Sequence, residues 1–149
     1  MTEMSLLLAL LFLPLLLGLM DFGRACYISL QIQNAARIAA QYGASNSTTL
    51  TDTAGMINEV KTQSPNVLPS GSCSSGACWA SGYPTAVYGC ECSGAASGSI
   101  NTTACGSCPV GQHVVDFVQV TAQANYTPWI PGIPSLVLKG QAKMRLGPP

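Results

Sequence analysis

The sequence contains very few charged residues for its length. Six lysines and arginines balance six aspartates and glutamates, so only 8% of the 149 residues are charged and the formal net charge is zero. Soluble domains usually carry about 25% charged residues, and a net charge near zero favours association. Nucleic-acid binding would require a basic patch. We therefore expect no nucleic-acid partner, and a chain that does not remain a free monomer.

Residues suited to catalysis are also scarce. His113 is the only histidine, and the sequence contains no G-x-S-x-G motif, P-loop or Rossmann fingerprint. A zinc site among the cysteines is a minor alternative, because only one Cys-x-x-Cys pair is present. We expect a protein that is not an enzyme, with no catalytic, cofactor-binding or metal-binding residue and no cofactor.

A long apolar run dominates the N-terminus. Residues 4–20 contain no charge and consist largely of leucine. As a helix they would span about 25 Å of the roughly 30 Å hydrocarbon core of a bilayer. A cleavable secretory signal would carry basic residues before the run and small residues at a cleavage site after it. Neither is present, and the helical pattern continues past Asp21, so we expect this stem to be retained.

Three residues of the stem bear on its role. Glu3 is costly at the edge of an apolar run unless it has a partner. The Met1 α-amino group of the same or a neighbouring chain is the nearest one, and exposure to headgroups and water is the alternative. Pro14 is expected to bend or loosen the helix, and Gly18 offers a flat place for close helix approach. Both suit a segment that repacks, although tolerated irregularity is the simpler explanation.

From Asp21 the pattern becomes amphipathic. Asp21 and Arg24 are three residues apart and can pair on the helix surface, whereas Cys26 is expected to be a small buried residue. Gly43 is a plausible C-cap, after which residues 45–49 are expected to form a loop. The apolar stripe of this segment comprises Ala25, Ile28, Ile32, Ala35, Ala36, Ala39 and Tyr42.

The remaining elements predict an α+β fold. One helix of about residues 3–42 packs through its C-terminal half on a small antiparallel sheet, which the alternating residues place at about 86–92, 114–127 and 136–146. A short second helix, capped by Thr51 or Asp52, is predicted for residues 51–64. We expect residues 1–24 to be the hydrophobic stem and residues 25–149 to be the globular head, with a disulfide-rich insertion at 66–112.

Six of the seven cysteines lie close together in that insertion, which is typical of disulfides formed in an oxidising compartment. Short separations favour local bridges such as Cys73–Cys78, but fifteen pairings are open. Cys105 and Cys108 have redox spacing, yet they precede a strand rather than a helix, which favours a structural disulfide. Asn46, Asn101 and Asn125 fit the glycosylation sequon. The six disulfide candidates are Cys73, Cys78, Cys90, Cys92, Cys105 and Cys108.

The order of motifs along the helix is specific. Residues 11–27 read LFLPLLLGLMDFGRACY and residues 33–40 read QNAARIAA. An acid, an apolar run with a proline, Gly-x-x-Asp-Phe-Gly-Arg and Asn-Ala-Ala-Arg therefore follow one another. This order resembles the TadE/TadG-like pseudopilins of tight-adherence pili, which are type IV pilin-like proteins, over about residues 1–42. Residues 118–145 resemble the closing strands of the same family more weakly.

The resemblance implies a prepilin-like protein. Such a protein is cut by a prepilin peptidase, waits in the inner membrane and is assembled by pilus machinery through its N-terminal helix. The resemblance also implies that Glu3 neutralises the Met1 amine of a neighbouring subunit. The resemblance further implies that the N-terminal helix is the segment through which subunits assemble. Besides Glu3 and Met1, its assembly residues are Pro14, Gly18, Asp21 and Arg24.

The leading hypothesis is therefore a structural subunit of an extracellular, type IV pilus-like filament on the cell surface, a homo-oligomer built through the N-terminal helices. A bitopic membrane protein whose head binds a ligand without polymerising is one alternative. A small extracytoplasmic thiol redox protein that uses Cys105 and Cys108 is another.

Overall fold

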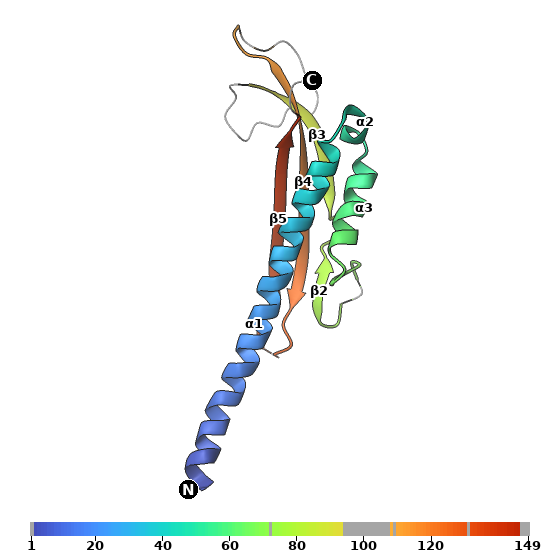
Figure 1. The fold of residues 1–149 in the computed structure, drawn as a ribbon. Helices are drawn as coiled ribbons and strands as arrows, with labels where there is room; N and C mark the ends of the chain where they lie inside the picture. Colours follow the sequence, from blue (N-terminus) through green and yellow to red (C-terminus); the bar gives the residue numbers. More distant parts are fainter. Residues whose placement is uncertain (1, 72, 94–107, 109, 131, 147–149) are drawn as a thin grey trace.

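The computed structural model has an α+β fold, in which a long helix rises from the N-terminus and its upper half lies against a sheet (Figure 1). It describes residues 2–71, 73–93, 108, 110–130 and 132–146, with side chains from Leu8 onward. The described elements are helices α1 (Thr2–Gly43), α2 (Ser47–Leu50) and α3 (Thr53–Gln63), and strands β1 (Val67–Leu68), β2 (Gly76–Trp79), β3 (Thr85–Cys92), β4 (Val114–Thr127) and β5 (Leu136–Arg145).

The long helix confirms the prediction from periodicity. α1 continues through Pro14 without interruption. Its apolar stripe is buried in the head, apart from Tyr42, which is half-buried against the same core. The stripe combines small alanines with two isoleucines, so the helix can lie close to the sheet while the isoleucines fill the space between them. The fully or almost fully buried members are Ala25, Ile28, Ile32, Ala35, Ala36 and Ala39.

β4 is the central strand of the sheet. It pairs antiparallel with β5 along one edge, and with β3 and β2 along the other. The three predicted strands are all present, and the predicted inward face of β4 is buried, from Val118 to Tyr126 at every second residue. Because α1 contacts β4 and β5, the helix covers the apolar face of the sheet and completes the core.

The sheet is mixed rather than purely antiparallel, because β1 runs parallel to β2. Both strands lie in the predicted disulfide-rich insertion, for which no strand before residue 86 was expected. All four residues of β2 are buried, so the strand shows no alternation between apolar and polar residues. A second difference is α2, which forms where a loop was expected, because the Asn46 side chain and Thr49 make a capping box.

Gly140 marks the closest approach of the helix to the sheet. A Cβ atom built at this position would lie 2.8 Å from the backbone oxygen of Ile32 and 2.9 Å from its Cγ2. A side chain here would push the helix away, since the backbone cannot move aside as the end of a flexible side chain can. Glycine in β5 is therefore a condition for packing α1 on the sheet.

The short helix α3 is tied to the end of α1. The carboxylate of Asp52 accepts a hydrogen bond from Gly55 N at 2.9 Å, which caps α3, and another from the Tyr42 hydroxyl at 3.0 Å. The second bond and the negative charge of Asp52 raise the pKa of Tyr42. Met56 and Val60 of α3 are fully buried against the common core.

An ion cluster joins three strands on the outer face of the sheet. The Glu91 side chain is only 1% exposed, and its two oxygens lie 2.6 Å from Lys143 Nζ and 2.6 Å from Arg145 Nε. Lys143 also lies over the buried ring of Phe117, 4.2 Å from its centroid. Hydrogen bonding to Lys143 lowers the pKa of Glu91 against the opposing effect of burial, and Arg145 adds to the lowering.

This cluster predicts a dependence of stability on acid pH. Glu91 keeps its charge in the folded head at a pH where the unfolded chain, with a carboxyl pKa near 4.5, takes up a proton. The stabilisation is therefore complete above about pH 4.5 and is lost as the pH falls through the lower folded-state pKa. Glu91→Gln should flatten the fall of the thermal unfolding midpoint between neutral and acid pH, measured by circular dichroism in detergent.

Glu59→Gln is the matched control. Glu59 lies on α3 and has no ion pair among the described residues, so this variant should keep the wild-type slope. Equal slopes in the wild type and in Glu91→Gln would contradict the prediction.

Candidate functional site

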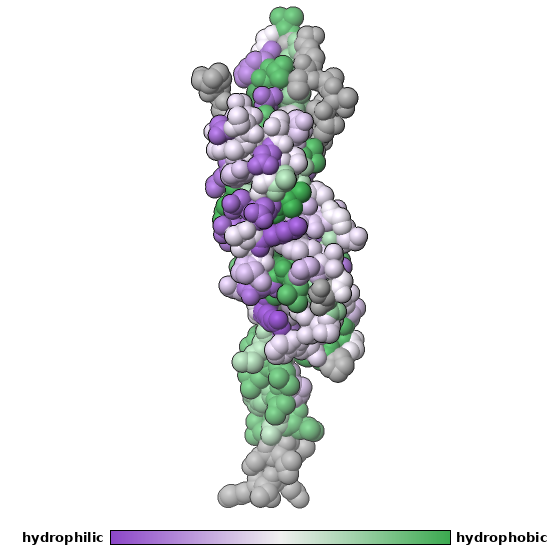
Figure 2. All heavy atoms as spheres, turned by 90° about the vertical axis from the view of Figure 1, so that its right-hand side faces the viewer, coloured by the Kyte–Doolittle hydropathy of each residue, from purple (hydrophilic) through white to green (hydrophobic). Residues whose placement is uncertain are grey.

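The stem has no protein cover. Every leucine, phenylalanine and methionine from Leu8 to Met20 is more than half exposed, from 51% at Phe12 to 77% at Met20. Figure 2 shows this hydrophobic surface below a head whose visible face is mostly hydrophilic or neutral. In the described part of the chain, α1 has the length and composition of a membrane-spanning helix. A surface of this kind requires an apolar environment, and its composition is consistent with localisation in a membrane.

The apolar surface of α1 continues beyond the stem. Phe22, Leu30 and Ile38 are 66%, 60% and 39% exposed. They recur every eight residues in an i, i+4 row, which also holds exposed Asn34 and winds across the outer side of α1. Tyr27, beside the row, is 60% exposed. Cys26 occupies the same row and is an exposed free thiol. Our prediction of a buried Cys26 was therefore wrong: the residue faces away from the stripe that begins at the neighbouring Ala25.

Asp21 joins the top of the stem to the end of β4. Its carboxylate accepts hydrogen bonds from the Tyr126 hydroxyl at 2.5 Å and from Trp129 N at 3.3 Å. The Tyr126 hydroxyl also lies 3.3 Å from the Asp21 backbone oxygen. Burial, and then the hydrogen bond to Asp21, raise the pKa of Tyr126 to about 12. The base of the head is thus fastened to one turn of α1.

Arg24 makes a different contact from the one expected. The sequence predicts a surface pair with Asp21, but the Arg24 guanidinium stacks over Trp129, 4.7 Å from the ring centroid. It also lies against the first residue of β2, where a Cβ built on Gly76 would be 3.1 Å from Arg24 Nη2. Gly76 has a φ of 92°, so both its backbone conformation and the nearby guanidinium favour glycine there. Asp21 and Arg24 each bind the head instead of each other.

A cleft opens at this junction. Its volume is about 290 Å³, and it is lined by stem residues and by residues of the loop between β4 and β5. Four of the six lining side chains are apolar, and the two charged ones are the pair that begins the head half of α1. The lining residues are Leu17, Met20, Asp21, Arg24, Trp129 and Ile130.

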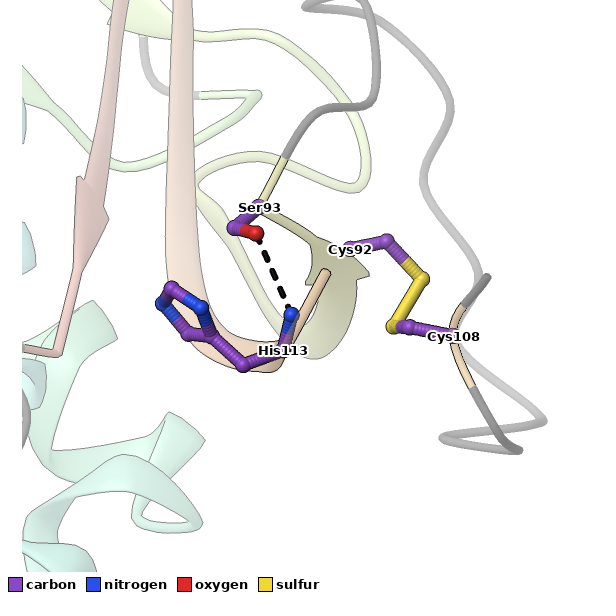
Figure 3. Close-up of a disulfide and its surroundings, with 4 residues drawn as sticks. All are labelled: Cys92, Ser93, Cys108 and His113. Atoms are coloured by element: carbon purple, nitrogen blue, oxygen red, sulfur yellow. Dashed lines mark hydrogen bonds between the residues drawn. A yellow bond between two sulfur atoms is a disulfide. The ribbon is translucent and has the colours of Figure 1, made fainter. Parts of the chain in front are cut away.

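One disulfide lies at the end of the sheet away from the cleft, and another joins β2 to the segment just before it. Cys73 is bonded to Cys78, and Cys92 to Cys108. Cys90 is also a disulfide cysteine. Because Cys108 is bonded to Cys92, the Cys-x-x-Cys spacing does not form a bridge of its own. Figure 3 shows the Cys92–Cys108 bond beside the Ser93–His113 hydrogen bond, with the imidazole directed away from the sulfurs.

Several predicted residues fall outside the described part of the structure. Met1, the side chain of Glu3, Asn101 and Cys105 belong to this group. Pro14 and Gly18 lie within α1, and a Cβ built on Gly18 meets nothing within 4 Å. Among the other sequon asparagines, Asn46 caps α2 through its side-chain oxygen and Asn125 is exposed on β4. Their glycosylation remains a prediction.

Comparison with known proteins agrees with the resemblance in the helix. The family model described as TadE-like protein matches residues 1–41. The N-terminal segment of this chain is TadE-like. The TadE-like segment and the apolar helix fit a subunit related to Tad pili. No curated protein and no solved structure is significantly similar to the chain.

The head contributes residues to this region that sequence reasoning missed. The sequence patterns gave neither Tyr126 nor Trp129 a role at this junction. Their partner Asp21 is 105 and 108 residues away along the chain. No local pattern reports such a separation. The usable signal was an acid and a base, Asp21 and Arg24, at the boundary between stem and head, and their spacing pointed to each other rather than to the head.

The Asp21–Tyr126 contact predicts a stability change. Tyr126→Phe removes the hydroxyl that donates to the carboxylate, and the loss should be about 1–3 kcal/mol of unfolding free energy because the acceptor is charged. Urea unfolding in detergent, followed by circular dichroism, measures it. Tyr88→Phe is the matched control. Tyr88 is 45% exposed on β3, so removing its hydroxyl should change stability little. Equal effects of the two variants would contradict the assignment.

Proposed function

We propose that this chain is a structural, non-enzymatic subunit of an extracellular, type IV pilus-like filament of the Tad kind. The TadE-like segment supports the pilus system, and the bare stem supports assembly through α1. In this proposal the subunit waits in the inner membrane with its disulfide-bonded head outside the cytoplasm. Prepilin peptidase and pilus assembly machinery, both implied by the family resemblance, then process it and build it into a homo-oligomer on the cell surface.

The observation that carries the proposal is the apolar row above the stem. A bilayer covers about 30 Å of a helix, and the run that ends at Met20 spans about 25 Å of it. Phe22, Leu30 and Ile38 extend up to about 27 Å further along α1 at 1.5 Å per residue. Leu30 and Ile38 lie beyond the reach of that bilayer and are left exposed by the head, whereas neighbouring helices in a bundle would cover them. A membrane protein that never polymerises would leave these side chains exposed to water.

The two halves of α1 would gain different free energies on assembly. Lipid tails are as apolar as leucine, so the stem gains packing contacts rather than hydrophobic burial when it leaves the bilayer. The row leaves water instead, and each fully buried Phe or Leu contributes about 1.5–3 kcal/mol. The water-exposed half of α1 therefore supplies a hydrophobic driving force that the stem lacks.

Leu30→Glu tests this step. A charge in the helix bundle would be desolvated without a partner, so filament yield should fall by about tenfold or more, while membrane insertion and head stability stay at wild-type levels. Electron microscopy and quantification of filaments sheared from cells provide the measurement. Leu68→Glu is the matched control on β1, where an exposed leucine lies outside α1. A wild-type yield for Leu30→Glu would count against the row as an interface.

Glu3→Ala tests the other end of the helix. If the carboxylate neutralises the Met1 amine of a neighbour, its loss leaves a positive charge in the apolar core of the filament. The subunit should then accumulate in the membrane without assembling, and Glu3→Asp should restore part of the yield. Fractionation of cells into membrane and sheared material measures both variants. Normal filaments from Glu3→Ala would remove this role from Glu3.

One observation favours a second candidate function. A cleft of about 220 Å³ lies in the head between α3, β1 and β2, lined by Lys61, Val67, Pro69, Ser70, Trp79 and Tyr83. A bitopic membrane protein with a ligand-binding head would use such a cleft and would not polymerise. Electron microscopy of sheared surface material separates the two candidates, since only the first produces filaments.

A further inference from the structure

The cleft at the stem–head junction lies where a bilayer would end. The apolar run stops at Met20, and the six lining residues belong to the last turn of the run, the first turn of the head and the loop after β4. Trp129 and Ile133 of that loop are 68% and 47% exposed. Tryptophan is enriched at the level of lipid headgroups, because its ring is apolar and its N–H is polar. The cleft is therefore placed between headgroups and acyl chains.

Arg24 gives this cleft a charge with unused donors. The guanidinium carries five N–H donors, yet it makes no hydrogen bond to any described group, and Nη1 is buried without a partner. The guanidinium instead stacks on the ring of Trp129. The carboxylate of Asp21, which lines the same cleft, already accepts from Tyr126 and Trp129. Arg24 as a whole is half-buried, so its accessible N–H groups remain open to an oxygen-rich ligand at the mouth of the cleft.

We propose that the cleft binds one phospholipid of the outer leaflet of the membrane in which the subunit waits. The phosphate pairs with the accessible part of the Arg24 guanidinium, which suits phosphate oxygens in geometry and charge. An acyl chain lies along Leu17 and Met20, and Trp129 closes the cleft at headgroup level. The inference rests on the membrane-anchored state of the proposed function and is independent of polymerisation.

Native mass spectrometry of the full-length protein tests the site. The protein is extracted in detergent and offered phosphatidylglycerol, a diacylglycerol with the same acyl chains, or inorganic phosphate. One phosphatidylglycerol should be retained per chain, because headgroup and acyl chain act together. Diacylglycerol and inorganic phosphate should each be retained at least about tenfold less than phosphatidylglycerol. A tenfold difference corresponds to the loss of roughly one paired contact.

Two variants and a control assign the contacts. Arg24→Gln should lower phosphatidylglycerol retention by about tenfold or more. Leu17→Trp should also lower it by narrowing the acyl slot, and it leaves the head intact because Leu17 is 52% exposed outside the core. Arg37→Gln, an exposed arginine on the same helix, should retain lipid as the wild type does.

The proposal is overturned if Arg24→Gln and Leu17→Trp both retain phosphatidylglycerol at the wild-type level. Retention of diacylglycerol equal to that of phosphatidylglycerol overturns it as well, since the phosphate would then contribute nothing. If either result occurs while filament yield stays normal, the lipid site is refuted and the proposed function stands. Specific retention by a chain that forms no filaments supports the lipid site while the proposed function fails.

Discussion

The structure depends on one helix that is placed in two different surroundings. The lower half of α1 exposes large apolar side chains on all sides, whereas the upper half buries a narrow stripe of alanine and isoleucine against the sheet. No single solvent satisfies both halves. Water suits the polar residues of the upper half, and only lipid or protein suits the stem. The chain therefore suits the boundary between an apolar environment and water, and its head packs around the part of the helix that extends into water.

The head meets this constraint by close packing rather than by size. Ala35, Ala36 and Ala39 present little more than backbone to the sheet, and Gly140 lets the β5 backbone approach Ile32 without a side chain between them. Close approach allows a short sheet to cover the stripe completely. On the outer face, Glu91 draws Lys143 and Arg145 together across the same strands. The edge strand β5 is thus held from both faces.

The parts of this fold that follow from periodicity were predictable, and the parts that depend on distant partners were not. The stripe of α1 and the alternation in β4 and β5 predicted which elements form and which of their faces are buried. Each pattern reflects one buried side of a regular structure. β1 and β2 have no such pattern, since they are short and β2 is buried throughout. Cys26 was misplaced because adjacent residues on a helix face different directions, and its small size alone suggested burial. The cleft and its contacts depend on residues more than 100 positions apart.

The Asp-Phe-Gly-Arg segment shows how a local motif gains a long-range role. As neighbours on a helix, Asp21 and Arg24 would contribute a few tenths of a kcal/mol to each other. In the structure Asp21 instead accepts from Tyr126 and Trp129, and Arg24 stacks on Trp129, so both tie the end of β4 to one turn of α1. The upper stripe already fixes the head along the helix, and these contacts fix it at the point where the stem begins. The row from Phe22 to Ile38 is then held at a constant angle to the head. A subunit that packs this row against a neighbour would place its head in a defined direction, which a flexible tether between stem and head could not do.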